Sequence, residues 1–179
     1  MYTTNYNPTF AHDDVGVYGP KAHQRVISKL NSGLGPLYYS EGKLALEPLP
    51  ETMLNDGEAS RSDGPPVPDL ILYDNEARTT PIIIEVCHTD GLRRDIRKVI
   101  QLVDADEYGI VEGFVYDYLT YEWYRYKKGD GGLTESSSYS GVLAMDLNQF
   151  LQNHSSVYRS GPYSLRNDLT GFCSAARML

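Results

Sequence analysis

The sequence predicts an α/β domain in which helices flank a mixed central β-sheet. The apolar residues change between helical and strand periodicity in the order helix, strand, strand, strand, helix, strand, strand. One of these strands, residues 81–88, is a nearly continuous apolar run, which is typical of a strand buried on both faces of a sheet. At 179 residues, the chain is long enough for one domain with its own core.

The first predicted helix begins at Pro20, since proline is frequent at the first position of a helix. One face of it carries a histidine and three apolar side chains at i, i+3, i+4 and i+7, namely His23, Val26, Ile27 and Leu30. We expect Gly33 and Gly35 to end this helix. Residues 1–19 are polar and are expected to form an N-terminal arm.

Three strands are expected next. A turn at residues 41–42 precedes a short strand within residues 43–50, and a polar loop follows at residues 51–66. Residues 67–74 form the second strand and residues 81–88 the central one.

The second helix is expected over residues 92–104, because its apolar side chains form one stripe. Residues 109–118 and 120–128 follow as two strands, and residues 129–141 are expected to be a flexible loop. Residues 142–151 read as a short strand or the start of a helix. The domain therefore spans residues 20–151, and residues 152–179 form a C-terminal tail or peripheral element.

Charge and composition exclude several classes of function. A net charge of −8 argues against broad nonspecific attraction to nucleic acid or to an anionic membrane, but it leaves room for a local basic patch. The two cysteines, Cys87 and Cys173, are far apart in sequence, which favours a reducing cytoplasmic location over a disulfide framework. No apolar run approaches the ~18 residues of a membrane span, so no membrane partner is expected.

Two carboxylates occur at the ends of predicted strands, sixteen residues apart. Asp69 follows a proline at a strand start, where a turn aspartate is the simplest interpretation. Glu85 follows three isoleucines in the buried strand, where an unpaired carboxylate is costly. A salt bridge to Arg93 or Arg94 is one solution. A divalent cation shared with Asp69 is the more economical one, because Mg²⁺ and Mn²⁺ prefer carboxylate oxygens and water.

The charged start of the second helix supplies a cation near these carboxylates. Asp95 and Lys98 lie three residues apart and flank one side of the apolar stripe. An ordinary amphipathic helix with ion pairs explains the same spacing.

Together these features resemble the PD-(D/E)XK nuclease superfamily, which implies a restriction-endonuclease-like fold. In that superfamily an Asp and a Glu on neighbouring strands hold Mg²⁺, and a lysine two residues after the Glu helps to activate water. Here that lysine position is Cys87, which we interpret as a packing residue because Mg²⁺ does not favour thiolate.

Residues 20–151 are more specifically similar to the Uma-two family of restriction endonuclease-like proteins. The motifs that match are His23-Gln24-Arg25-Val26, Pro68-Asp69, Glu85-Val86-Cys87-His88, Asp95-Ile96-Arg97-Lys98 and residues 109–117, with the hairpin at 121–126. The family's serine is His88 here. The helical lysine falls three rather than four residues after Asp95, which turns it by about 100° around the helix.

The resemblance implies metal-dependent hydrolysis of phosphodiester bonds in DNA. Asp69 and Glu85 would bind Mg²⁺ or Mn²⁺, with Glu47 as a further candidate metal ligand. Lys98 is the candidate for the missing lysine. His23 is either a core histidine or a residue of the site, and the resemblance favours the site. For His88 a role in holding a loop is slightly favoured over one at the metal.

Two other classes of function remain open. One is a catalytically inactive module that keeps the nuclease fold for binding or assembly, and the other is a domain that binds a small molecule or sugar phosphate. The tyrosine-rich hairpin at 116–126, with Arg125, Lys127 and Lys128, could stack on bases or contact phosphate. We favour the alternative that it is a strand surface or the face of a homodimer.

Overall fold

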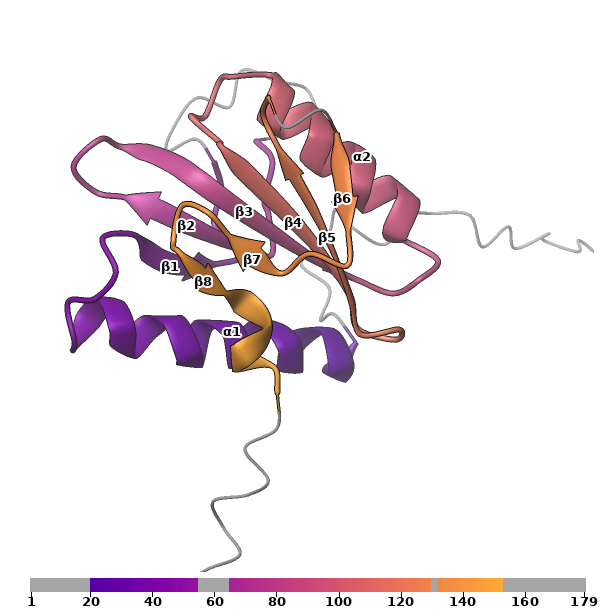
Figure 1. The fold of residues 1–179 in the computed structure, drawn as a ribbon, viewed down its shortest axis with the longest axis horizontal. Helices are drawn as coiled ribbons and strands as arrows, with labels where there is room; N and C mark the ends of the chain where they lie inside the picture. Colours follow the sequence, from indigo (N-terminus) through magenta and orange to yellow (C-terminus); the bar gives the residue numbers. More distant parts are fainter. Residues whose placement is uncertain (1–19, 55–64, 130–131, 153–179) are drawn as a thin grey trace, which may run out of the picture.

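A computed structural model describes residues 20–54, 65–129 and 132–152, and the predicted arm and nearly all of the predicted tail lie outside these residues. The described chain forms one six-stranded sheet and two α-helices (Figure 1). The strands follow the order of the sequence: β1 (Glu47–Pro50), β2 (Leu70–Asp74), β3 (Thr79–Cys87), β4 (Glu112–Asp117), β5 (Glu122–Lys127) and β6 (Leu133–Glu135).

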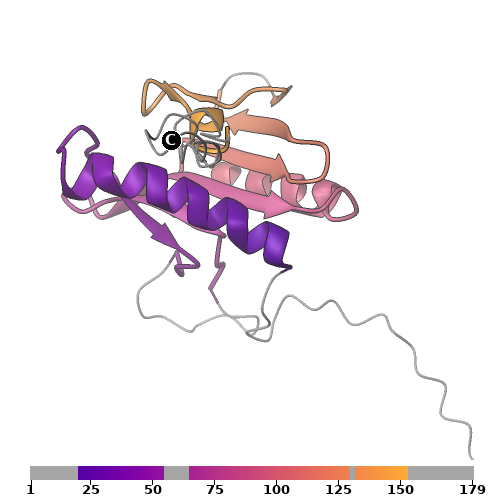
Figure 2. The ribbon, with the colours of Figure 1, turned by 90° about the horizontal axis from the view of Figure 1, so that it is seen from below.

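The sheet is mixed because only β3 and β4 pair in parallel, while the other neighbours are antiparallel. Helix α2 (Leu92–Asp104) makes the crossover between the two parallel strands. Helix α1 (Lys21–Tyr39) lies on the opposite face (Figure 2). The predicted mixed sheet flanked by helices is therefore confirmed.

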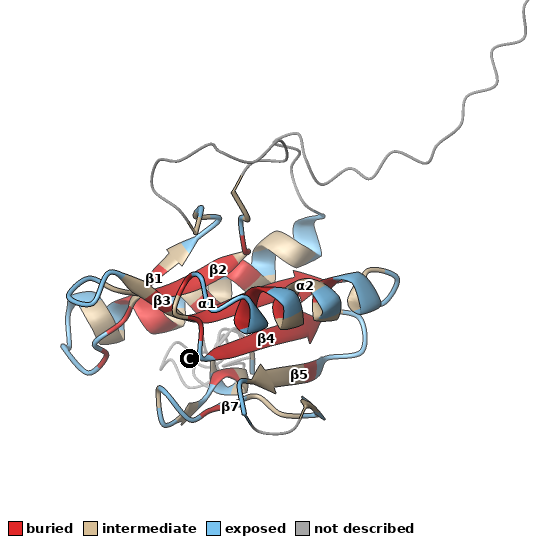
Figure 3. Cartoon of the chain, turned by 90° about the horizontal axis from the view of Figure 1, so that it is seen from above, coloured by how far each residue is buried: buried red, intermediate tan, exposed pale blue. Residues whose placement is uncertain are grey.

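Strand β3 is buried on both faces, as its apolar run predicts. Ile82, Ile84 and Val86 belong to the core layer under α1, whereas Ile83 and Cys87 belong to the layer under α2. Strand β4 beside it is buried along its whole length, including both of its terminal acids (Figure 3). Cys87 packs in the core, as expected.

The predicted end of the first helix was wrong. Helix α1 continues through Gly33, Gly35 and Pro36 to Tyr39. Gly33 serves packing instead, because a Cβ at this position would lie 2.2 Å from Cδ1 of Phe150. Phe150 ends a short 3-10 helix, η1 (Leu147–Phe150), which docks against α1.

The segment predicted to be a loop at 129–141 contains two strands. Strand β6 extends the sheet beside β5, and β7 (Tyr139–Ser140) pairs with β8 (Met145–Asp146). Glu112 of β4, wholly buried, holds this region by accepting hydrogen bonds from Ser140 Oγ at 2.7 Å and Gly141 N at 3.0 Å. Residues 142–151, expected to be a short strand or the start of a helix, contain one of each, the strand β8 and the 3-10 helix η1.

No helix in the described part of the chain has the length and apolar character needed to cross a membrane.

Candidate active site

Glu85 is a carboxylate buried near the end of the central strand. It is 4% exposed, and it faces α2 together with Ile83 and Cys87. Burial raises the pKa of Glu85 to about 8; the nearby charge of Asp69 acts in the same direction, and that of Lys98 opposes it. Even with Lys98 nearby, this carboxyl needs further positive charge to be ionised at neutral pH.

Asp69 lies against the backbone next to Glu85. It directly precedes β2, whose Leu70 pairs with Ile84 of β3. The amide N–H of Val86 donates a hydrogen bond of 2.6 Å to Asp69 Oδ2. The antiparallel register of the two strands therefore brings the two acids together, although sixteen residues separate them.

His23 reaches the same aspartate from the first turn of α1. Its Nε2 lies 3.1 Å from Asp69 Oδ2. Burial is the largest influence on the pKa of His23 and lowers it, but the hydrogen bond to Asp69 and the charges of Asp69, Glu51 and Glu85 outweigh it, so the pKa is raised. The pairing with Asp69 therefore favours the imidazolium form of His23.

Lys98 supplies the cation beside Glu85. Its Nζ lies 2.9 Å from Glu85 Oε1 and donates a hydrogen bond of 3.1 Å to the carbonyl oxygen of Val67. The spacing of three residues after Asp95 thus does not keep this amine from the carboxylate, and the flexible stem of lysine makes up the difference in direction.

The donor set fits a divalent cation that keeps part of its water shell. Glu85 Oε1 is buried. Lys98 Nζ lies close to this oxygen, but the angles between the two groups are not those of a hydrogen bond, so the oxygen can still bind another partner. Asp69 adds a second carboxylate. Within the described residues no three His, Cys, Asp or Glu side chains form a metal-holding group. Two carboxylates plus water and substrate oxygens are a usual set for Mg²⁺.

Glu47 does not join this group. It begins β1 opposite Tyr73, at the far end of β2 from Asp69. Its carboxylate accepts hydrogen bonds from Tyr39 Oη at 2.7 Å and from Asn75 Nδ2 at 2.8 Å. These neutral donors lower the pKa of Glu47 and explain its place without a metal.

His88 follows the end of β3. Its Nδ1 lies 3.3 Å from Asp90 Oδ2, and its ring meets that of Tyr118 edge to face. These contacts fit a role in holding the loop between β3 and α2.

Three further acids near the site were not singled out as site residues from the sequence. Glu51 follows β1 and donates its N–H to the Asp69 carbonyl at 3.0 Å, so the pairing of β1 with β2 is the signal that finds it. Asp95 is buried at the start of α2, and burial raises its pKa. Asp117 is the last residue of β4 and pairs with Cys87, so it is an acid at the same end of the neighbouring parallel strand as Glu85.

The mixed six-stranded sheet with a helix on each face is a restriction-endonuclease-like fold. Among solved structures, the chain is similar to a protein from Anabaena variabilis described as a "putative nuclease belonging to DUF820". The identity is 11%, the TM-score is 0.53, and the match covers 74% of this chain and 81% of the other. At this identity the likeness shows the fold alone.

Two larger proteins also match in part. They are the type IIG restriction endonuclease BpuSI, with 12% identity and a TM-score of 0.40, and DrdV in a complex with DNA, with 16% identity and a TM-score of 0.38. The matches cover 65% and 74% of this chain, but only 13% and 14% of those chains. No protein-family model matches the chain, and no curated protein matches it significantly in sequence.

Proposed function

We propose that this protein is a metal-dependent endonuclease that hydrolyses phosphodiester bonds in DNA, as the resemblance to Uma-two proteins implies. One observation carries the proposal: Asp69 lies where β2 begins, hydrogen-bonded to Val86 N, and Glu85, the adjacent residue near the end of β3, lies 2.9 Å from Lys98. A restriction-endonuclease-like fold with nuclease neighbours supports it.

In this proposal Asp69 and Glu85 hold one Mg²⁺ or Mn²⁺. The chemistry that such a cation supplies is polarisation of a phosphoryl oxygen and neutralisation of the charge that develops in the transition state. The protein itself contributes a fixed pair of acids. The 2.6 Å hydrogen bond from Val86 N orients Asp69, and the core around β3 orients Glu85.

Lys98 takes the part of the lysine that the superfamily places two residues after the Glu. Cys87 cannot do so, because burial raises the pKa of its thiol to about 12 and the side chain is neutral. The ammonium of Lys98 lies 2.9 Å from Glu85 and balances the carboxylate once it ionises. With substrate bound, the same amine orients the attacking water or pairs with a phosphate oxygen, as a compact point charge that carries its own donors.

His23 positions Asp69. Its Nε2 holds one carboxylate oxygen at 3.1 Å, and the charge of Asp69 helps to raise the pKa of His23, which favours the imidazolium. This arrangement leaves the second oxygen of Asp69 for a cation and prevents rotation of the carboxylate.

The alternative is an inactive nuclease-fold module that binds DNA or a partner protein. One observation favours it: Lys98 already lies 2.9 Å from Glu85, so the buried acid has an ion-pair partner without a metal. In an active enzyme, the cation must compete with this ion pair.

Cleavage of supercoiled plasmid and of single-stranded DNA, with Mg²⁺ or Mn²⁺ and then with chelator, tests the proposal. We expect metal-dependent cleavage by the wild type, a loss of about 100-fold or more in Glu85→Ala and Lys98→Met, and no change in Glu47→Gln. Equal residual activity in wild type and Glu85→Ala rules out the nuclease. DNA binding without cleavage supports the inactive module.

A further inference from the structure

The turn between β4 and β5, residues 118–121, lies at the same end of the sheet as the candidate active site. Tyr118 N donates a hydrogen bond of 3.0 Å to the carbonyl oxygen of Cys87, two residues after Glu85. Thr89 Oγ1 donates one of 2.6 Å to Asp117 Oδ2, which ties the turn to the loop that leads into α2. Figures 1 and 2 show the turn and the start of α2 at one end of the molecule.

This turn exposes large apolar side chains. Tyr121 is 76% exposed, more than any other large hydrophobic side chain in the described part of the protein, and Leu119 is 55% exposed. Neither side chain belongs to a core cluster. An exposed aromatic ring and an exposed leucine beside a proposed nuclease site offer apolar surface to a ligand.

The backbone of Tyr121 strengthens this argument. Its φ of 63° lies in the left-handed region, which glycine adopts readily and a bulky aromatic residue rarely does. The conformation is fixed by Asp117, whose carbonyl accepts the Tyr121 N–H at 2.8 Å and whose carboxylate accepts the Leu119 N–H at 2.9 Å. A tyrosine at a position suited to glycine costs stability, and such exceptions concentrate at functional sites.

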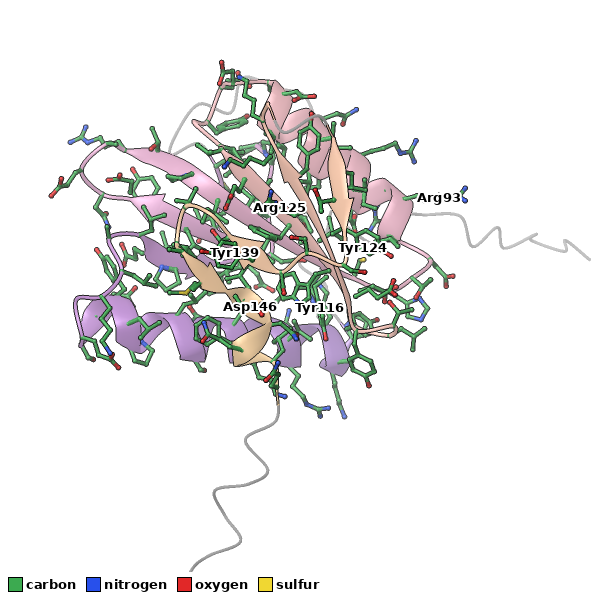
Figure 4. The ribbon with its side chains drawn as sticks, in the orientation of Figure 1. Arg93, Tyr116, Tyr124, Arg125, Tyr139 and Asp146 are labelled. Carbon is green, nitrogen blue, oxygen red and sulfur yellow. The ribbon has the colours of Figure 1, made fainter. Side chains whose placement is uncertain are left out.

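Positive charge gathers next to this end of the sheet. Arg93 and Arg97 lie four residues apart in the first two turns of α2, and both are exposed, so they share one face of the helix. The side chain of Arg93 makes no hydrogen bond or ion pair with the described residues and points away from the body of the molecule (Figure 4). In a chain of net charge −8, this pair is a local concentration of positive charge, of the kind that contacts phosphates in protein–DNA complexes.

We propose that Tyr121 and Leu119 form a platform for unpaired bases of a DNA strand, whose phosphates lie along Arg93 and Arg97. Every base has a π-face, so such stacking is independent of sequence and requires bases that are not paired. The inference rests on the proposed function, in that DNA is the substrate, and it deepens it: the substrate is single-stranded or locally melted DNA.

The test compares binding of labelled oligothymidylate and of a DNA duplex by fluorescence anisotropy, in chelator so that no cleavage occurs. We expect the wild type to prefer the single strand and Tyr121→Gly to lose about tenfold in its affinity for it, the usual effect of removing one stacking ring. Glycine suits the backbone here, so the variant should unfold at the same or a higher urea concentration. Tyr39→Ser is the control. It removes an exposed tyrosine at the C-terminal end of α1, whereas His23 of the site lies at the N-terminal end, and it should bind DNA like the wild type.

The arginines are tested by the salt dependence of binding. Arg93→Gln combined with Arg97→Gln should reduce the slope of log affinity against log salt by about one to two. Two results together support the platform. Tyr121→Gly loses affinity while the slope stays unchanged, and the arginine double variant shows a reduced slope. Equal affinity of wild type and Tyr121→Gly for the single strand overturns it, as does a wild-type preference for duplex.

Hydrolysis of bis(p-nitrophenyl) phosphate with Mn²⁺ separates this inference from the proposed function, because the compound has no bases to stack. Normal hydrolysis by Tyr121→Gly together with unchanged single-strand binding leaves the nuclease standing and rejects the platform. Absent hydrolysis by the wild type together with binding that depends on Tyr121 rejects the nuclease and keeps the platform. A dimer that Tyr121→Gly dissociates, with DNA binding unchanged, assigns the turn to a second copy and rejects it.

Discussion

Replacing Glu85 with glutamine should change how the stability of the protein depends on pH. Glutamine keeps the shape of the side chain and cannot ionise. In the folded protein burial raises the pKa of Glu85 from 4.5 to about 8. The folded state therefore holds a proton that the unfolded state has released, and the stability of the wild type falls as pH rises from about 4.5 toward about 8.

The magnitude follows from the same two values. Each pKa unit corresponds to about 1.4 kcal/mol. Between about pH 5 and about pH 7 the wild type should therefore lose about 2–3 kcal/mol of unfolding free energy relative to Glu85→Gln. This is a large part of the ~5–15 kcal/mol by which natural domains are stable.

Urea unfolding at both pH values, followed by tryptophan fluorescence, measures this difference. Trp123 is the only tryptophan, it is 3% exposed, and its Nε1 donates to Asn148 Oδ1, so its emission reports loss of the core. Titrating groups that do not sense the charge of Glu85 behave alike in both proteins and cancel in the comparison. If the difference in stability is the same at both pH values, Glu85 is not a buried acid with a raised pKa, and the reasoning about its need for a cation fails.

Other substitutions test the packing and the site supports by the same urea titration. Gly33→Ala should lower the unfolding free energy by about 1–2 kcal/mol, because the new Cβ would lie 2.2 Å from the Phe150 ring, whereas Gly35→Ala should raise it by about 0.5–1 kcal/mol; equal effects would refute the close contact. Asp117→Ala should cost about 2–4 kcal/mol, because Thr89 Oγ1 and two backbone N–H groups of the turn lose their acceptor. Burial alone would raise the pKa of Asp117, but the hydrogen bonds it accepts lower it, so part of this advantage of the wild type should be lost as pH falls below the usual aspartate pKa of 3.8; an advantage that does not change with pH would contradict the assignment.

The central part of the fold could be predicted because strong patterns coincide there. The apolar run before Glu85 has one solution, a strand covered on both faces, and the stripe from residue 92 onward has one solution, a helix covering that strand. The connection of β3 through α2 to β4 follows from these two elements. Asp69 and Glu85 could be proposed as a pair of metal ligands because acids at strand ends stand out against apolar neighbours.

The periphery could not be predicted because tertiary contacts decide it. Gly33 is a poor helix former, yet α1 runs through it because a ring from η1, more than a hundred residues later in the chain, needs the space. The polar residues 133–140 read as a loop, but pairing with β5 and the buried acceptor Glu112 order them as β6 and β7. Such partners are invisible to local periodicity.

The same limit applied to the site. Glu47 is the first residue of β1, and Glu51 directly follows its last residue. Only the register of β1 against β2 decides that Glu51 lies beside Asp69 and that Glu47 does not. The direction of Lys98 could not be read from helical spacing either. The spacing places the Cα of Lys98 on a different side of the helix from the expected lysine, but the long side chain lets the amine reach Glu85.

The central claim, that Asp69 and Glu85 together bind a divalent cation, is tested most directly by titrating Mn²⁺ into the protein and following free Mn²⁺ by electron paramagnetic resonance. We expect one binding site in the wild type, with an affinity that increases as pH rises toward the Glu85 pKa of about 8, because binding releases its proton. Asp69→Asn and Glu85→Gln should lose this site, and Glu47→Gln should keep it. Equal Mn²⁺ binding by the wild type and Glu85→Gln would contradict the claim.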